Sequence, residues 1–218
     1  MAVVAEELVS RTIDLPSGPL EVLQPDYAAE LPDDGPIEWA PVAPYWSVLW
    51  RSGVALAREL DGAPLRDERV VELGCGLALP SIVAARAGAS VLATDEAPEA
   101  LALAERNGSQ NGVQLATALG DWSQPDELLR RGPFDVVLAA DVLYERRSVA
   151  ALLALLPRLA PEVWLADPGR PAAAAFLEQA EARWPVETRV RGIVSIHRLR
   201  PGASAGRGAG GIGRPRWS

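Results

Sequence analysis

Residues 69–95 read RVVELGCGLALPSIVAARAGASVLATD: an apolar run, a glycine turn, a second apolar stretch and a run that ends in an acid. The short β-branched run at 69–73 is typical of a buried strand. The stretch at 79–88 predicts a helix that Gly88 ends, and residues 90–95 predict a second strand. A strand, a helix and a strand in this order predict a parallel βαβ unit.

The same alternation continues along most of the chain. It predicts strands at 113–118, 134–140 and 162–167, and helices at 98–107, 125–131, 147–159 and 171–183. Because these strands are continuous apolar runs, helices are expected on both faces of the sheet. Residues 188–199 predict one or two last strands, at an antiparallel edge. The predicted fold is a doubly wound α/β domain.

Three segments are expected along the chain. Residues 1–44 form an N-terminal β-hairpin, at 11–23 around Pro16-Ser17-Gly18, and a proline-rich extended segment. Residues 45–200 form the α/β domain, which opens with a helix that places Trp46 and Trp50 on one side. Residues 201–218 are glycine- and arginine-rich and are expected to be disordered.

Composition narrows the functional classes. The 218 residues are 49% hydrophobic and 23% charged, as in soluble globular proteins, and neither a membrane span nor a secretion signal is apparent, so we expect a cytoplasmic protein. One cysteine and one histidine leave no ordinary zinc site, and no metal is expected. The net charge of −8 disfavours nucleic acid as a partner. The acidic N-terminal forty residues either attract a cationic partner or form a solvated face.

The predicted strand ends carry the residues with chemical potential. In open parallel sheets, ligands bind beyond the carboxyl ends of the strands. Gly74 and Gly76 follow the first strand and let the backbone approach a ligand closely, or they merely close a loop. Leu79 stands where dinucleotide binding requires a third glycine, which argues against a diphosphate. Asp95 ends the second strand, where a carboxylate accepts hydrogen bonds from ribose hydroxyls.

Two later strand ends complete the pattern. Asp121 and Trp122 supply an acceptor for an adenine amino group and a ring that stacks on the base. Asp141 and Tyr144 follow the fourth strand. The alternatives are that Asp141 caps the next helix and that Tyr144 packs at the surface of the core. Together the strand ends suit a nucleoside without a diphosphate.

The motifs resemble a known family when they are taken together. VVELGCGLALPSIVAARAG, LATDEAPEALALAERN, GDW and FDVVLAADVLYE resemble successive motifs of class I S-adenosylmethionine (SAM) dependent methyltransferases. APYWSVLWRSGVALAREL is similar to a segment of the nicotinamide N-methyltransferase-like and protein-lysine methyltransferase group. LADPGRP is similar to a stretch of the branch that includes the electron-transfer flavoprotein β-subunit lysine methyltransferase. The resemblance covers residues 12–200 and implies a Rossmann-like methyltransferase fold with a mostly parallel, seven-stranded sheet.

The resemblance also implies a cofactor and its contacts. The cofactor is SAM, and the implied binding residues are Trp50, Glu72, Gly74, Cys75, Gly76, Asp95, Asp121, Trp122 and Ala140. Asp141 and Tyr144 are the implied catalytic residues, at the site of methyl transfer. Ala78 departs from the usual family pattern after the two glycines, and Thr94 stands where the flavoprotein branch often has asparagine. These departures weaken the assignment to one branch.

The predicted function is methylation of a lysine side chain of a protein substrate by direct in-line transfer. An acceptor amine attacks only when it is uncharged, so a pocket walled by Tyr45, Trp46 and Tyr144 suits it. Asp141 or Glu145 is the candidate to orient the amine and receive its proton.

The alternatives to this function are a small-molecule N-methyltransferase acting on a small amine, and a non-catalytic SAM-binding scaffold. We expect a monomer with neither membrane nor nucleic acid as a partner. Arg170 either binds a substrate carboxylate or belongs to a simple turn.

Overall fold

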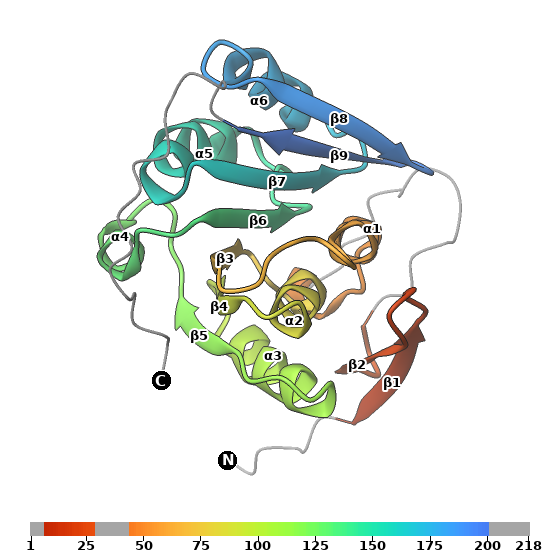
Figure 1. Cartoon of the computed structure of the whole chain (residues 1–218). Coiled ribbons are helices and arrows are strands. Elements are labelled where there is room, and N and C mark those ends of the chain that lie inside the picture. Colours follow the sequence, from red (N-terminus) through yellow and green to blue (C-terminus); the bar gives the residue numbers. More distant parts are fainter. Residues whose placement is uncertain (1–6, 29–43, 201–218) are drawn as a thin grey trace.

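The computed structural model describes residues 7–28 and 44–200 and contains a central seven-stranded sheet (Figure 1). The strands lie in the order β5-β4-β3-β6-β7-β9-β8. Their bounds are β3 Arg69–Leu73, β4 Ser90–Asp95, β5 Ala116–Leu119, β6 Val136–Ala140, β7 Glu162–Asp167, β8 Val186–Arg191 and β9 Val194–Leu199. The first five strands in this order are parallel, and β9 and β8 form an antiparallel edge. The doubly wound α/β prediction is confirmed, with its antiparallel edge.

Helices cover both faces of this sheet (Figure 1). They are α1 Arg51–Leu60, α2 Leu79–Arg86, α3 Pro98–Gln110, α4 Asp126–Arg131, α5 Arg146–Leu159 and α6 Pro171–Ala180. Alternate residues of β3 enter the two cores: Val70 packs with α1, α2 and α3, whereas Val71 and Leu73 pack with α4, α5 and α6. All five residues of β3 are buried, as expected of a strand covered on both faces.

The order of the strands determines where a ligand site can form. The chain runs outward from β3 through β4 to β5, and then returns to the other side of β3 at β6. This reversal opens a crevice at the carboxyl ends of β3 and β6, where open parallel sheets bind ligands.

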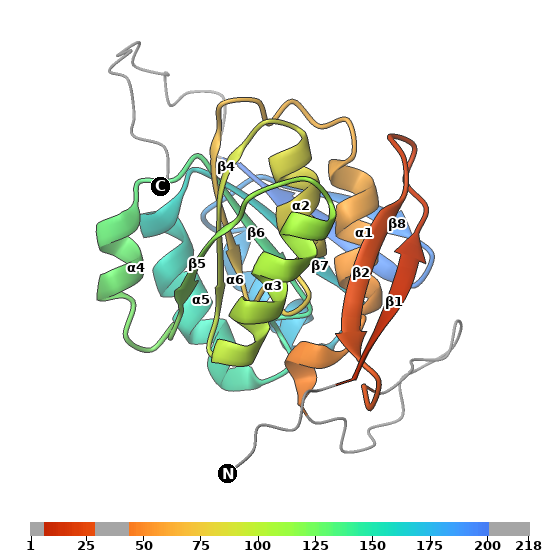
Figure 2. The same cartoon turned by 90° about the horizontal axis from the view of Figure 1, so that it is seen from below.

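The N-terminal hairpin is present and forms a separate two-stranded sheet. Strand β1 (Leu8–Ile13) pairs antiparallel with β2 (Leu20–Pro25), and Ile13 lies opposite Leu20. Gly18 has a positive φ of 121° in the connecting turn. Figure 2 shows the hairpin beside α3 and α1, and its buried residues share one core with those helices.

The predicted helix over residues 45–60 is wrong in its first third. Residues Tyr45–Ser47 form a single 3₁₀ turn, Val48 and Trp50 are extended, and α1 begins only at Arg51. Trp46 and Trp50 therefore do not share a helix face. A local hydrogen bond accompanies the break: the Trp50 indole donates to the Tyr45 carbonyl, at 2.9 Å. Tyr45, Trp46 and Trp50 line a cavity here, and the helix that their spacing predicts does not form.

The remaining expectations differ from the structure only at element ends. Helix α3 continues to Gln110, three residues beyond the predicted Asn107. The segment boundaries at 44 and 200 stay predictions, and the tail at 201–218 and most of the proline-rich segment lie outside the described residues. None of the helices in the described ranges is both long and apolar enough to cross a membrane.

Candidate active site

A cavity of about 640 Å³ lies at the carboxyl edge of the parallel strands. This volume is within the range of about 300–1,000 Å³ that is typical of small-molecule sites. Its lining contains every candidate site residue: Trp50, Glu72, Gly74, Cys75, Gly76, Asp95, Asp121, Trp122, Ala140, Asp141 and Tyr144. The fold therefore brings together residues that are spread over nearly one hundred positions of the chain. Their individual roles stay predictions.

The glycine loop, residues 74–78, forms one end of this cavity. Gly74, Gly76 and Ala78 all have positive φ angles, of 65°, 48° and 62°. A Cβ atom at Gly76 would lie 3.0 Å from the Trp46 carbonyl oxygen, so this position has no room for a side chain. Ala78 holds a left-handed conformation that alanine rarely adopts, and surrounding contacts must stabilise it.

The Asp95 carboxylate anchors the glycine loop. Its Oδ2 accepts from the Gly76 amide at 2.9 Å, and its Oδ1 accepts from the Ala97 amide at 3.0 Å. Asp95 is 8% exposed, and burial raises its pKa above the usual range although these amides oppose the shift. Each carboxylate oxygen can accept a further hydrogen bond. Asp95 can therefore hold the loop and a ribose hydroxyl together.

Two buried side chains lie behind the loop. The Glu72 carboxylate accepts hydrogen bonds from the backbone amide and the hydroxyl of Ser81, near the start of α2. Burial raises the pKa of Glu72 to about 8. Burial also raises the pKa of the Cys75 thiol, with the Glu72 and Asp95 charges acting in the same direction. Cys75 is thus suited to packing and not to nucleophilic attack.

Trp122 and Asp121 differ in their relation to the cavity. The Trp122 ring packs against Gly74, with its Cζ2 atom 3.5 Å from where a Cβ would lie. The exposed Asp121 carboxylate accepts from the backbone amide and hydroxyl of Ser123 at 2.8 and 2.6 Å. These bonds lower the pKa of Asp121. Asp121 is engaged in a local turn, and its contact with adenine stays a prediction.

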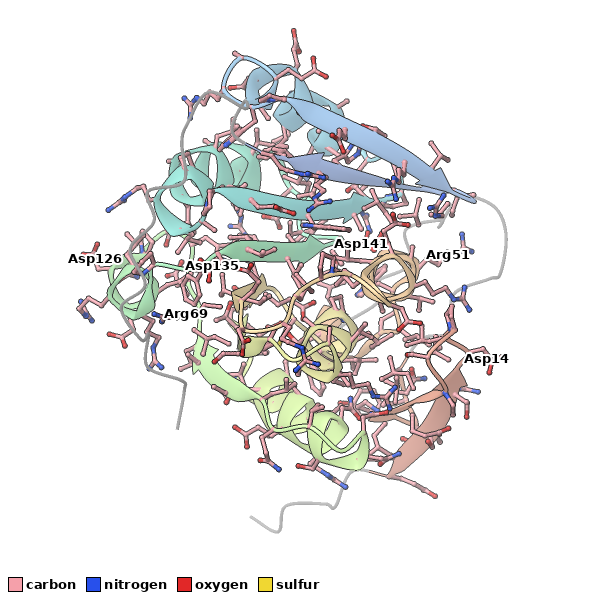
Figure 3. All side chains as sticks on the ribbon, viewed as in Figure 1. Asp14, Arg51, Arg69, Asp126, Asp135 and Asp141 are labelled. Atoms are coloured by element: carbon pink, nitrogen blue, oxygen red, sulfur yellow. The ribbon has the colours of Figure 1, made fainter. Side chains whose placement is uncertain are left out.

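An ion pair between Asp141 and Arg170 also lines the cavity. Oδ1 of Asp141 accepts from Nε and Nη2 of Arg170 at 3.1 and 2.8 Å. The two side chains are only 6% and 11% exposed. The Arg170 guanidinium also lies over the Trp50 ring, 5.6 Å from its centroid. Figure 3 shows Asp141 at the end of β6 near α1. This pair links β6, the β7–α6 loop and the start of α1.

The structure decides two alternatives left open by the sequence. Helix α5 takes Glu145 as its N-cap residue, so Asp141 does not cap it. Arg170 belongs to a turn that leads into α6, as one alternative had it, and its side chain also pairs with Asp141; binding of a substrate carboxylate stays a prediction. Sequence reasoning missed this partnership. The available signal was that Asp141 and Arg170 each follow a predicted strand. The structure shows that these strands, β6 and β7, are neighbours.

Asp167 fixes the loop that carries Arg170. Its Oδ1 accepts from the amides of Gly169 and Arg170 at 2.7 and 2.6 Å. Burial, together with the nearby Asp141 charge, raises the pKa of Asp167 to about 6, although the amides of Arg170 and Gly169 oppose the shift. Asp167 thus shapes the loop that carries Arg170 without lining the cavity.

Aromatic rings and acids form the mouth of the cavity. The Tyr45 and Tyr144 rings lie 5.9 Å apart and are 45% and 38% exposed as residues. Glu145 lines the cavity beside them and forms an ion pair with Arg147. His197 lies elsewhere, buried and 2.9 Å from the Thr188 hydroxyl, as expected of an ordinary core histidine.

The family is decided by residues 45–164, which match the model of a protein family described as lysine methyltransferase. The chain belongs to the lysine methyltransferase family. The matched range contains all the candidate site residues and ends within β7. Arg170 and the N-terminal hairpin lie outside it.

Curated members of the family match about half of the chain. A zebrafish (Danio rerio) protein N-lysine methyltransferase, METTL21A, is 36% identical over 52% of this chain and 55% of its own length. A Xenopus laevis histone-arginine methyltransferase, METTL23, is 35% identical over 50% of this chain and 49% of its own length. A rat (Rattus norvegicus) electron transfer flavoprotein β subunit lysine methyltransferase is 31% identical over 61% and 54%. The chain thus spans about half the length of the curated relatives it matches, and these identities do not separate the branches of the family.

A solved structure supports the fold of the family. The magnesium protoporphyrin IX methyltransferase of Synechocystis, crystallised with bound SAM, is 22% identical, with a TM-score of 0.53 over 68% of this chain and 77% of that protein. The cavity residues here also fit SAM. The glycine loop leaves no side chain between backbone and ligand, Asp95 offers acceptors for a ribose, and the Trp122 ring is available for a base.

Proposed function

We propose that this chain is a SAM-dependent methyltransferase that methylates the side-chain nitrogen of a lysine in a protein substrate. The observation that carries the proposal is a single cavity with two differently built ends. The glycine loop and Asp95 line the part that we call the cofactor end. Asp141, Arg170 and Tyr144 line the part that we call the acceptor end. Membership of the lysine methyltransferase family supports the same activity.

The residues of the chain would act by binding and positioning. SAM supplies a methyl group on a positively charged sulfur, so no protein nucleophile is required. Positioning an acceptor in line with that group can provide much of the rate enhancement. The two hydrogen bonds from Arg170 both reach Oδ1 of Asp141, so we assign Oδ2 to accept a hydrogen bond from the acceptor amine.

The mouth of the cavity would favour the uncharged form of an amine. Aromatic rings at Tyr45, Trp46 and Tyr144 exclude water from their faces, and a dry environment lowers the pKa of an amine. Glu145 stands at the same mouth and is the candidate to receive the proton that the amine releases.

The exposure of the mouth favours a protein acceptor over a metabolite. Tyr45 and Tyr144 are each more than one-third exposed, so the acceptor end of the cavity opens at the surface of the described part of the chain. A lysine side chain is long enough to reach from a docked protein into such a mouth. A metabolite enzyme more often encloses its substrate, with 70–90% of the ligand surface buried.

A second acceptor chemistry has support from one kind of relative. The Xenopus laevis relative is named as a histone-arginine methyltransferase, and it is 35% identical over 116 residues. An arginine side chain would be recognised at the same mouth, by the same acids and rings. Lysine remains the favoured acceptor because the family description and the other two relatives name it.

Incubation of the purified protein with methyl-labelled SAM and a lysate of its host tests the proposal. We expect label in a protein, and mass spectrometry of the labelled peptide should place the added methyl on lysine; methyl on arginine would select the second candidate. Label confined to small metabolites would select a small-molecule enzyme. Binding of SAM without any label would indicate a scaffold. The Asp95→Ala variant is the control, because it should lose most of the labelling.

Two finer expectations belong to the same proposal. We propose that the protein acts in the cytoplasm and as a monomer. Fluorescence microscopy of the tagged protein in its host and size-exclusion chromatography with light scattering would test these points.

A further inference from the structure

Asn107 of α3 and Asn111, the C-cap residue of that helix, bind the free edge of the N-terminal hairpin. Oδ1 of Asn107 accepts from the Leu23 amide at 2.8 Å, and its Nδ2 donates to the Leu23 carbonyl at 3.1 Å. Asn111 binds Glu21 in the same way, at 3.0 and 2.6 Å. Each side-chain amide thus satisfies one residue of β2 as a neighbouring strand would. We refer to Asn107 and Asn111 as the asparagine pair.

The spacing of the asparagine pair matches the spacing of the strand. Four residues of an α-helix rise about 6 Å. Two residues of a β-strand rise about 6.7 Å. Asn107 and Asn111 therefore meet Glu21 and Leu23 in register along β2, and helix and strand need little adjustment.

The two asparagines differ in their remaining hydrogen bonds. Nδ2 of Asn107 also donates to the carbonyl oxygen of Leu77, at 3.1 Å, inside the glycine loop. Nδ2 of Asn111 donates instead to the Asn107 carbonyl at 2.7 Å, and its Oδ1 accepts from Arg86 at 2.8 Å. Asn107 is fully buried. Asn107 therefore joins the hairpin to the loop, whereas Asn111 joins the hairpin to α2 and α3.

The contact with Leu77 falls at the strained part of the glycine loop. Gly76 and Ala78, on either side of Leu77, have positive φ angles of 48° and 62°. A left-handed alanine persists only where neighbouring contacts over-determine it. Asp95 holds the Gly76 amide from the cavity side, and Asn107 holds the next carbonyl from the opposite side. The loop is thus fixed between a carboxylate and an amide.

We propose that Asn107 is a positioning residue for the cofactor site: it holds the glycine loop in its binding conformation and couples the loop to the N-terminal hairpin. This inference rests on the proposed function in so far as the loop binds SAM. It gives the hairpin, which lies outside the residues matched by the family model, a role in cofactor binding.

The asparagine pair provides a matched comparison, because Asn107→Ala and Asn111→Ala each remove one clamp on β2 and only the first removes the bond to Leu77. The measurements are the affinity for S-adenosylhomocysteine by calorimetry and ligand-free amide exchange by NMR. We expect Asn107→Ala to weaken binding about tenfold. It should also speed exchange of the Gly76 and Ala78 amides. Asn111→Ala should change the affinity less than about twofold and speed exchange only in the hairpin.

Equal affinities and equal loop exchange in the two variants would overturn the proposal. If Asn107→Ala does not fold, the unmodified protein still decides the matter, because coupling between two sites is reciprocal. S-Adenosylhomocysteine should then slow exchange of the Leu23 amide, which donates to Asn107, more than that of the Glu21 amide. No difference between these two amides would overturn the proposal. Absence of binding to the unmodified protein would instead refute the proposed function, and ligand-free loop exchange would still test the role of Asn107.

Discussion

The two ends of the cavity are built in different ways. At the cofactor end, the carboxylates of Glu72 and Asp95 accept hydrogen bonds from the backbone of the protein itself. At the acceptor end, the residues that line the cavity contact one another through their side chains: Asp141 pairs with Arg170, and Tyr45 packs against Tyr144. Only behind them does a carboxylate, that of Asp167, accept from backbone amides. The difference indicates that main-chain hydrogen bonds fix the cofactor end, whereas contacts between side chains shape the lining of the acceptor end.

Exposure follows this division only at the two tyrosines, because Asp141 at the acceptor end is itself only 7% exposed. Glu72 and Asp95 are 1% and 8% exposed, whereas Tyr144 and Tyr45 are 38% and 45% exposed. A buried, backbone-fixed end suits a ligand that never changes. A partly exposed end built of side chains suits acceptors that differ between members of a family, because substitutions there need not move the main chain.

The largest effect is expected from the Asp141–Arg170 pair. Arg170→Met leaves a carboxylate that is only 6% exposed without its ion-pair partner. Removing one partner of a buried pair typically costs about 4 kcal/mol, so we expect the free energy of unfolding to fall by roughly this amount. Urea denaturation measures it. The acceptor end would then be a structural element as well as a substrate site.

A double-mutant cycle separates pairing from packing. Asp141→Asn is the suitable partner variant, because asparagine tolerates the positive φ of 59° at this position. The double variant should lose at least about 1 kcal/mol less stability than the two single losses added together. Additive losses, or a loss under about 1 kcal/mol for Arg170→Met, would show that the pair contributes little and that the contrast between the two ends is smaller than we infer.

The next effect concerns the cofactor end. Asp95→Ala removes the acceptor of the Gly76 amide together with the proposed acceptor of the ribose. Two such hydrogen bonds to a charged group are worth about 3 kcal/mol, which corresponds to a loss of roughly 100-fold in affinity. Calorimetry with S-adenosylhomocysteine measures it. Asp95→Asn keeps one acceptor oxygen and should lose only about tenfold; unchanged affinity in both variants would remove Asp95 from the site.

The sequence carries a stronger signal for the glycine loop and Asp95 than for the Asp141–Arg170 pair, because the first are local features of the backbone. Glycine spacing and a strand-terminal acid such as Asp95 are local signals, because they describe how the backbone itself turns and binds. The Asp141–Arg170 pair joins residues from two loops, and only the strand order makes them neighbours. Local patterns do not contain that order.

The strand-and-helix alternation was predictable throughout because each buried element carries its own apolar pattern. The segment at 45–50 was not, because cavity contacts replace helical ones there. Its aromatic residues have helical spacing, yet Trp50 instead bonds to the Tyr45 carbonyl and packs under Arg170. The clamp of Asn107 and Asn111 on β2 likewise joins elements more than eighty residues apart, beyond the reach of any local pattern.

The pH dependence of stability should distinguish the two ends. Burial raises the folded-state pKa of Glu72 from 4.5 to about 8, so the folded chain binds a proton that the unfolded chain releases between these values. The contribution of Glu72 to the free energy of unfolding is therefore fully present below pH 4.5. It is lost as the pH rises from 4.5 through 8, at about 1 kcal/mol per pH unit. Glu72→Gln should flatten the profile of urea midpoints across this window.

The acceptor end provides the matched control for that profile. The folded-state pKa of Asp167 is raised from 3.8 to about 6, so the corresponding loss is complete near pH 6. Asp167→Asn should therefore flatten the profile only below pH 6, and it keeps an acceptor for the Gly169 and Arg170 amides. Between pH 6 and 8, only Glu72→Gln should therefore flatten the profile; a similar change there in Asp167→Asn would show that the two ends do not titrate separately.

The smallest effect on folding and binding is expected from Tyr144→Phe. The substitution removes a hydroxyl from a ring that is 38% exposed and keeps the contact with Tyr45, so stability should change by less than about 0.5 kcal/mol. Affinity for S-adenosylhomocysteine should stay within about twofold, because the cofactor end is fixed by the main chain and not by this side chain. Transfer of labelled methyl to the acceptor protein should nevertheless fall, and Tyr45→Phe serves as the comparison for a neighbouring hydroxyl. If Tyr144→Phe weakened cofactor binding as much as Asp95→Ala, the two ends would form one coupled site, and substitutions at the acceptor end would not be free to change the substrate alone.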